Sequence, residues 1–154
     1  MEKNKLRMFN EGPVEILLVE DNPGDVRLTR EIFKECNVPH VLHVVKDGEE
    51  AMAFLRQEGD YQDVKRPALI LLDLNLPCKD GREVLAEIKK DGALQRIPIV
   101  VLTTSAAKED IFQAYQLHAN CYILKPVDLD QFQNVVQGLS EFWLRIVELP
   151  SRYE

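Results

Sequence analysis

The sequence predicts an α/β fold in which a five-stranded parallel sheet carries helices on both faces. Five short, almost continuous runs of Val, Ile and Leu occur along the chain, and such runs are typical of strands buried on both faces. Segments with apolar residues at helical spacing separate these runs. Strands that alternate with helices pair in parallel, because each helix returns the chain to the same end of the sheet.

The five predicted strands cover residues 14–19, 41–45, 68–72, 97–102 and 121–124. Only Glu15 interrupts the first apolar run. Right-handed crossovers leave few possible topologies, and we expect the flavodoxin-like strand order 2-1-3-4-5, the commonest for five such units.

Five helices are predicted after the strands. The first runs from about Pro23 to Cys36, with Asn22 as a capping residue in front of the proline. Asp47 is the candidate cap of the second helix, and Glu50, three residues later, gives a pattern close to a capping box. Helical spacing places the second, third and fourth helices around 51–55, 84–88 and 111–115. The fifth is extended and covers about 129–149.

The chain has 154 residues and a net charge of −7, which suits one acidic domain. That charge argues against nonspecific nucleic-acid binding, and no apolar run approaches the ~20 residues of a membrane span. We expect a flexible arm over 1–12, a single domain over 13–150 and no output domain. Three widely spaced cysteines form neither a disulfide framework nor a zinc pattern, which favours a cytoplasmic protein.

Polar residues follow four of the predicted strands, at the end where open parallel sheets bind ligands. They are Glu20 and Asp21 after the first strand, Asp73 after the third, Thr103 and Ser105 at the fourth, and Lys125 after the fifth. In the order 2-1-3-4-5 the first, third and fourth strands are neighbours. We therefore expect carboxylates, hydroxyls and one ammonium group to converge on one crevice.

Clustered carboxylates repel one another unless a cation compensates them. Hard oxygen ligands favour Mg²⁺, which takes one or two carboxylates and keeps several waters. We expect Asp21 and Asp73 to bind Mg²⁺ directly, Glu20 to act through water, and the backbone carbonyl of Asn75 to complete the set. With Lys125 and a hydroxyl for phosphoryl oxygens and a carboxylate nucleophile, the pattern predicts a phosphoryl-transfer site.

These motifs resemble the receiver domain of two-component response regulators over about residues 14–139. The resemblance is carried by Glu20-Asp21, Asp73-Leu74-Asn75-Leu76-Pro77 with Gly81, Thr103, and Tyr122 with Lys125-Pro126. It implies that Asp73 accepts a phosphoryl group from a histidine kinase. It also implies no enzymatic activity beyond the chain's own phosphorylation and slow self-dephosphorylation. Glu20 departs from the aspartate of many receivers, which affects only the water-mediated position.

The resemblance further implies a conformational switch. Thr103 would move toward the phosphoryl group and Tyr122 would swing inward. This would reshape the face formed by the fourth predicted helix, the fifth predicted strand and the fifth predicted helix. Asn75 and Ser105 would tune the lifetime of the phosphorylated state, and the Lys125-Pro126 bond would be cis. A packed aromatic at a strand edge is the alternative for Tyr122.

Three further segments are similar to the stand-alone response regulators of cyanobacterial bacteriophytochrome-type kinases. They cover residues 21–27, 76–85 and 142–150. The similarity implies a phytochrome-type histidine kinase as partner, while the downstream target is not indicated.

The extended last helix carries more apolar residues than one sheet face needs. They form two overlapping stripes with steps of three and four residues, the spacing of a helical seam. We expect a homodimer through Phe132, Val135, Leu139, Phe142, Trp143 and Ile146. The alternative is that this tail folds back on its own domain.

Two other functional classes are compatible with part of the pattern. A phosphohydrolase with Asp73 as nucleophile would usually need a second aspartate two residues on, where this chain has Asn75. A receiver-like scaffold that is never phosphorylated is disfavoured by the complete set of Asp73, Thr103 and Lys125.

Overall fold

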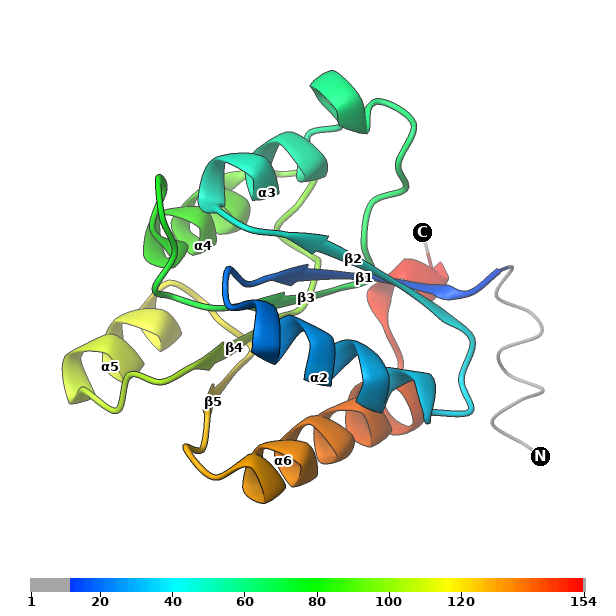
Figure 1. The fold of residues 1–154 in the computed structure, drawn as a ribbon. Coiled ribbons are helices and arrows are strands. Elements are labelled where there is room, and N and C mark those ends of the chain that lie inside the picture. The colour runs from blue at the N-terminus through cyan, green and yellow to red at the C-terminus, as the bar shows by residue number, and fades with distance from the viewer. Residues whose placement is uncertain (1–11, 154) are drawn as a thin grey trace.

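The computed structural model describes residues 12–153 and shows a five-stranded parallel sheet in the order β2-β1-β3-β4-β5 (Figure 1). This confirms the predicted strand order. The strands are β1 (Val14–Val19), β2 (His40–Val45), β3 (Leu69–Leu72), β4 (Ile99–Thr103) and β5 (Cys121–Leu124). Most of the arm predicted over 1–12 lies outside the described residues.

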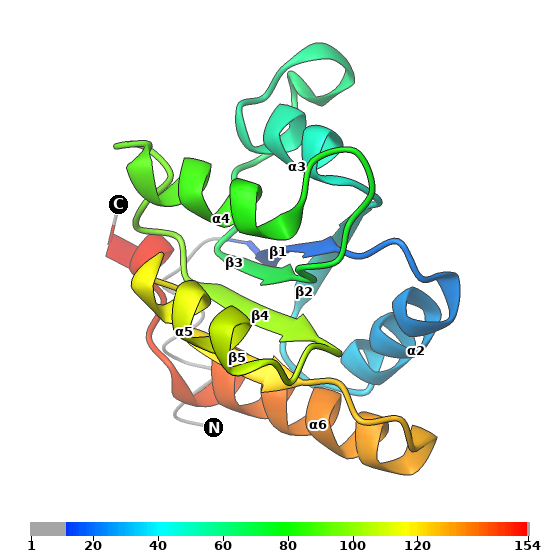
Figure 2. The same ribbon diagram turned by 90° about the vertical axis from the view of Figure 1, so that its left-hand side faces the viewer.

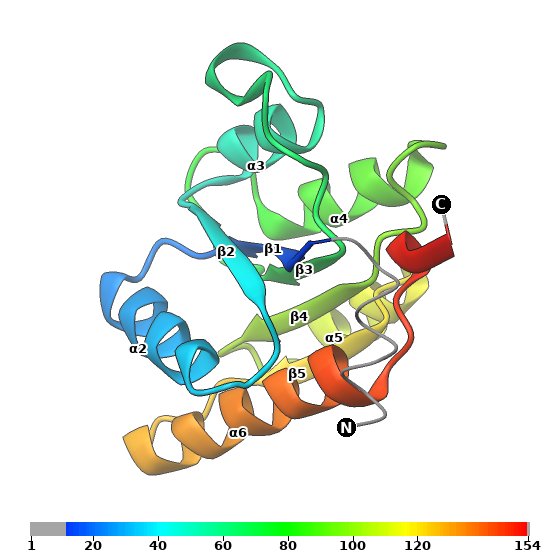
Figure 3. The ribbon, with the colours of Figure 1, turned by 90° about the vertical axis from the view of Figure 1, so that its right-hand side faces the viewer.

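Within the described residues, five α-helices cover the two faces of the sheet. They are α2 (Pro23–Lys34), α3 (Gly48–Leu55), α4 (Gly81–Lys90), α5 (Lys108–Gln116) and α6 (Leu129–Glu141). α2 and α6 lie together on one face, whereas α3, α4 and α5 cover the other (Figures 2 and 3). Alternate residues of β1 and β3 point into the two cores, which explains why β3 is apolar throughout and β1 is apolar except at Glu15.

Capping side chains begin the first two of these helices where the sequence predicts them. The Asn22 side chain accepts a hydrogen bond from the Asp25 N–H at 3.1 Å, and Asp47 accepts one from the Glu50 N–H at 2.8 Å. Both caps stand directly after the carboxyl ends of neighbouring strands. The start of α2 is thereby held at the edge of the sheet where the candidate site residues gather.

The prediction of one regular helix over 129–149 is wrong. α6 ends at Glu141, a π-helical turn covers Phe142–Ile146, and the backbone is extended at Val147. The N–H of Val147 donates to the carbonyl of Phe142, five residues back, at 2.9 Å. The extra residue in this turn places Leu144 in the core, 1% exposed, where a regular helix would place Trp143.

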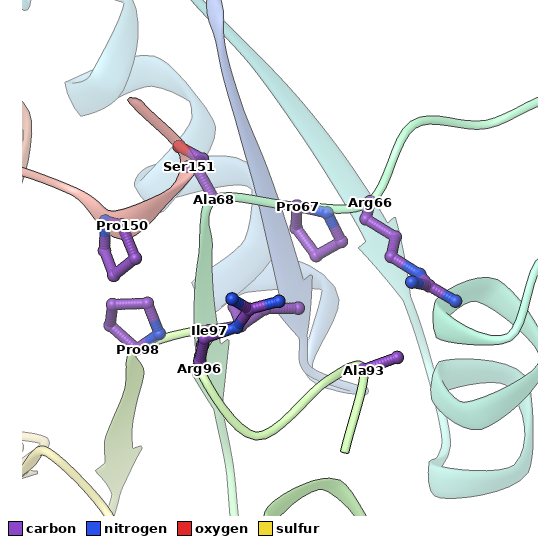
Figure 4. Close-up of a pocket in the computed structure, with 9 residues that line it drawn as sticks. All are labelled: Arg66, Pro67, Ala68, Ala93, Arg96, Ile97, Pro98, Pro150 and Ser151. Atoms are coloured by element: carbon purple, nitrogen blue, oxygen red, sulfur yellow. The ribbon is translucent and has the colours of Figure 1, made fainter. Parts of the chain in front are cut away.

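After the π-helical turn the chain continues to the amino-terminal ends of the central strands. Pro150 and Ser151 close a small pocket of about 130 Å³ at the amino-terminal ends of β3 and β4 (Figure 4). Arg66 and Arg96 also line it and are exposed. Within residues 12–153, no helix combines the length and apolarity needed to cross a bilayer.

Candidate functional site

The carboxyl ends of β1, β3, β4 and β5 bring the predicted site residues together. The N–H of Asp73 donates to the carbonyl of Val19 at 3.1 Å, and the N–H of Lys125 donates to the carbonyl of Thr103 at 2.8 Å. These ladder bonds continue the parallel registers past the last strand residues, so neighbouring strands present their polar residues at the same level. The carboxyl ends of these strands lie on the left of the sheet in Figure 1.

Three carboxylates form the acidic part of the site. Glu20, Asp21 and Asp73 each offer a carboxylate oxygen, and these oxygens all lie within 4.8 Å of one another. Glu20 is 3% exposed and Asp73 7% exposed, whereas Asp21 is exposed. Oxygen atoms at this spacing, from partly desolvated carboxylates, fit a hard divalent cation.

Lys125 provides the compensating positive charge. Its side chain is 6% exposed, and its Nζ lies 3.3 Å from Asp73 Oδ2 and 3.0 Å from Asp25 Oδ2. It also donates to Glu20 Oε1. The sequence analysis did not identify Asp25. Its position in the first turn of a helix that begins beside the carboxyl end of β1 could have indicated it.

Burial changes the titration of the two most enclosed groups. Desolvation raises the pKa of Glu20 to about 7, although the hydrogen bond and charge of Lys125 act in the opposite direction. Burial alone would lower the pKa of Lys125, but its contacts with Glu20 and Asp73 raise that pKa above its ordinary value. Lys125 is therefore a permanent cation at neutral pH.

Asp73 is held through both of its carboxylate oxygens. Oδ1 accepts hydrogen bonds from the Thr103 hydroxyl at 2.8 Å and from the N–H of Asn75 at 3.1 Å, and Oδ2 faces Lys125. The Asn75 side-chain amide reaches the Thr103 hydroxyl at 3.5 Å. A buried carboxylate with fixed oxygens, a hydroxyl and an ammonium beside it can act as an oriented nucleophile.

The Lys125-Pro126 peptide bond differs from the expectation. It is trans, since residues 12–153 contain no cis peptide bond. A trans bond is the lower-energy form for most X–Pro pairs, by about 0.5–1 kcal/mol. The contacts of Lys125 with its three carboxylates are made with this trans bond in place.

A second network joins Tyr122 to α4 and α5. The Tyr122 hydroxyl donates to the Ser105 carbonyl at 2.8 Å, and the Ser105 hydroxyl donates to Asp110 Oδ2 at 2.5 Å. Arg82 pairs with Asp110 at 2.8 Å and with Asp80 at 3.1 Å. Burial raises the pKa of Tyr122, whereas bonds from Ser105 and Arg82 lower the pKa of Asp110. Sequence reasoning named Tyr122 and Ser105 but missed Arg82 and Asp110.

Arg82→Gln should loosen the loop between β4 and α5. The variant removes the charged partner that holds Asp110. Hydrogen exchange over residues 103–110, followed by mass spectrometry, should accelerate up to about fivefold. Arg27→Gln is the control, because the ion pair of Arg27 within residues 12–153 is with the exposed Glu31 on α2. Equal exchange in wild type and Arg82→Gln would refute the coupling.

Comparisons with known proteins identify a matching family and similar chains. Residues 16–137 match the model of the response regulator receiver domain. The chain is 53% identical over 139 residues to response regulator Rcp1 of Synechocystis sp., covering 90% of this chain and 95% of Rcp1.

Two crystal structures show the same likeness in three dimensions. The Mn²⁺-bound form of Rcp1 has a TM-score of 0.88 at 54% identity, covering 90% of this chain and 99% of the other. The phosphorylated cyanobacterial phytochrome response regulator RcpA has a TM-score of 0.88 at 57% identity, with the same coverage of 90% and 99%. The likeness therefore extends over nearly the whole described fold.

Proposed function

The chain belongs to the response regulator receiver family, and from this membership we propose that a histidine kinase phosphorylates it on Asp73. The observation that carries the proposal is the environment of Asp73, whose two carboxylate oxygens face Thr103 on one side and Lys125 on the other. The phosphorylated chain then signals by changing what it binds. Its chemistry is limited to its own phosphorylation and slow self-dephosphorylation.

The proposed transfer is a single displacement at phosphorus. A carboxylate oxygen of Asp73 attacks the phosphorus of a phosphohistidine, the P–N bond breaks, and the leaving imidazole takes up a proton. Lys125 and Thr103 donate hydrogen bonds to two of the phosphoryl oxygens as charge builds on them. Each group already stands beside Asp73, so little reorganisation is needed.

The residues that would hold a divalent cation are the three clustered carboxylates and one carbonyl. Asp21 and Asp73 would bind Mg²⁺ directly, Glu20 would act through water, and the Asn75 carbonyl would complete the set. The spacing of the carboxylate oxygens supports this assignment, as does the Mn²⁺-bound relative Rcp1. A bound cation would supply charge neutralisation between these carboxylates and an incoming phosphoryl group.

We propose that the signal leaves the site through Thr103 and Tyr122. Thr103 bonds Asp73, and the Tyr122 hydroxyl bonds the carbonyl of Ser105, two residues after Thr103. A shift of Thr103 toward a phosphoryl group would therefore move the loop that Tyr122 touches. The face formed by α5, β5 and α6 would change with it. Asn75 and Ser105 would tune the lifetime of the modification.

The proposed output face carries several large apolar side chains that are exposed. Exposed hydrophobic side chains on it are Phe112, Tyr115, Leu124, Val127 and Leu129. Apolar side chains gathered on one face of a small protein are typical of an interaction surface. The partner kinase is proposed to be of the phytochrome type, on the similarity to Rcp1 and RcpA.

The test uses the full chain with Mg²⁺ and either acetyl phosphate or a phosphorylated histidine kinase. One phosphoryl group per chain, located on Asp73 by mass spectrometry, is the expected result. A panel of kinases, including a phytochrome-type kinase, then tests the choice of partner. Absence of any adduct, including one with beryllofluoride, would favour an unphosphorylated scaffold. Sustained phosphate release from small phosphate esters would instead indicate a hydrolase.

We also propose that a second copy of the chain docks against the end of α6. Phe132 and Leu139 are each 4% exposed and belong to this chain's own core, which leaves four of the six predicted contact residues for a partner. Those are Val135, Phe142, Trp143 and Ile146, of which Val135 and Trp143 are partly buried against the same core. A groove between β5 and α6 includes three of them, and Phe142 and Ile146 are 49% and 61% exposed.

Replacing Phe142 and Ile146 together by Glu should make the protein monomeric. Two charges at the centre of an apolar contact cost several kcal/mol to desolvate, so a micromolar dimer should dissociate. Sedimentation of the phosphorylated and unphosphorylated forms measures this. Val41→Glu serves as control, since Val41 is 37% exposed on the edge strand β2. A wild-type protein that sediments as a monomer in both forms would remove the dimer proposal.

A further inference from the structure

Asp25 is a fourth carboxylate at the site, contributed by the first turn of α2. Its Oδ2 lies 3.0 Å from Lys125 Nζ, while Glu20 and Asp73 accept from the same ammonium group. An ammonium group has three N–H donors, and the three carboxylates match them one for one. The Lys125 side chain is 6% exposed, so water has little part in this arrangement.

The position of Asp25 is set by Asn22. The Asn22 side chain accepts from the N–H of Asp25 at 3.1 Å, and the N–H of Asn22 donates to Glu20 Oε2 at 3.2 Å. One capping residue thus aligns two of the carboxylates that bind Lys125. Because Asp25 uses its backbone for the cap, its side chain is left for Lys125.

Asp25 differs from the other two partners of Lys125 in its chemistry. Glu20 and Asp73 belong to the group of three carboxylates whose oxygens meet within 4.8 Å, and Asp25 does not. The positive charge of Lys125 competes with a divalent cation for Glu20 and Asp73, because the same two side chains serve both. The contact of Asp25 with Lys125 holds part of the ammonium charge away from Glu20 and Asp73, which weakens this competition.

We propose that Asp25 is a positioning residue for Lys125. It shares the ammonium charge, so that Lys125 offsets less of the negative potential that Glu20 and Asp73 offer to a divalent cation. It also retains Lys125 at the site when a phosphoryl group takes over the contact with Asp73. The inference rests on the proposed function and adds α2 to the machinery of phosphoryl capture.

The test measures Mn²⁺ binding to the full chain by electron paramagnetic resonance, which distinguishes free from bound Mn²⁺. Asp25→Asn should weaken Mn²⁺ binding about tenfold, the usual loss when a group behind a metal ligand is removed. Asp25→Glu keeps the charge and should restore most of the affinity. Glu31→Gln removes a carboxylate from the exposed side of the same helix and should leave the affinity unchanged. Equal affinity of wild type and Asp25→Asn would overturn the proposal.

A double-mutant cycle with Lys125→Gln separates positioning from simple attraction between Asp25 and the cation. If Asp25 acts through Lys125, Asp25→Asn should lose most of its effect in the Lys125→Gln background. Fully additive effects would overturn the positioning role. Wild-type protein that binds no Mn²⁺ and gains no phosphoryl group would overturn the proposed function as well. If the wild type binds Mn²⁺ and gains a phosphoryl group, and Asp25→Asn binds Mn²⁺ with the same affinity, only this inference is refuted.

Discussion

Asp73→Asn is expected to abolish phosphorylation, both from a histidine kinase and from acetyl phosphate. The amide has no anionic oxygen to attack phosphorus, so the rate should fall by at least about a thousandfold. The shape of the side chain is kept, and its oxygen can still accept from the Thr103 hydroxyl. The substitution also removes one charge from a crowded group of carboxylates, so the variant should remain folded.

Intact-mass measurement after incubation with a phosphorylated kinase checks this result. Asp80→Asn is the matched control, because it makes the same chemical change at the cap of α4 and asparagine also caps helices. The control should be phosphorylated at the wild-type rate. Phosphoryl transfer that survives in Asp73→Asn would show that another residue is the acceptor.

Gly81→Ala is expected to damage both stability and phosphorylation. A Cβ at this position would lie 2.3 Å from the backbone oxygen of Asp73 and 2.6 Å from the Cα of Leu74. Leu74 is fully buried, and its carbonyl accepts from the N–H of Gly81 at 3.0 Å, so neither backbone can move away easily. The free energy of unfolding should fall by about 1–3 kcal/mol, the usual cost of overpacking.

Urea denaturation measures the loss of stability, and the phosphorylation assay measures the displacement of Asp73 in the protein that remains folded. Gly92→Ala provides the comparison, because a Cβ there meets no atom within 4 Å. It should change the free energy of unfolding by less than about 0.5 kcal/mol. Equal stability of the two variants would mean that the turn before α4 tolerates a side chain.

The sequence by itself determined the sheet and most of the site. Apolar runs such as 69–72 cannot face water on either side, so they predict central strands, and alternation with helices predicts parallel pairing. Parallel strands present their carboxyl ends at one edge. Residues that directly follow the strands, such as Glu20, Asp73 and Lys125, therefore meet whatever the details of packing.

Only the tertiary structure decided the contacts that join separate elements. The pairing of Asp25 with Lys125 and that of Arg82 with Asp110 depend on how α2, α4 and α5 sit against the sheet. Sequence spacing describes one element at a time and contains no distance between elements. The π-helical turn at the end of α6 has the same origin: the apolar pattern predicts one helix over 129–149, but packing ends α6 at Glu141 and buries Leu144 in the turn that follows.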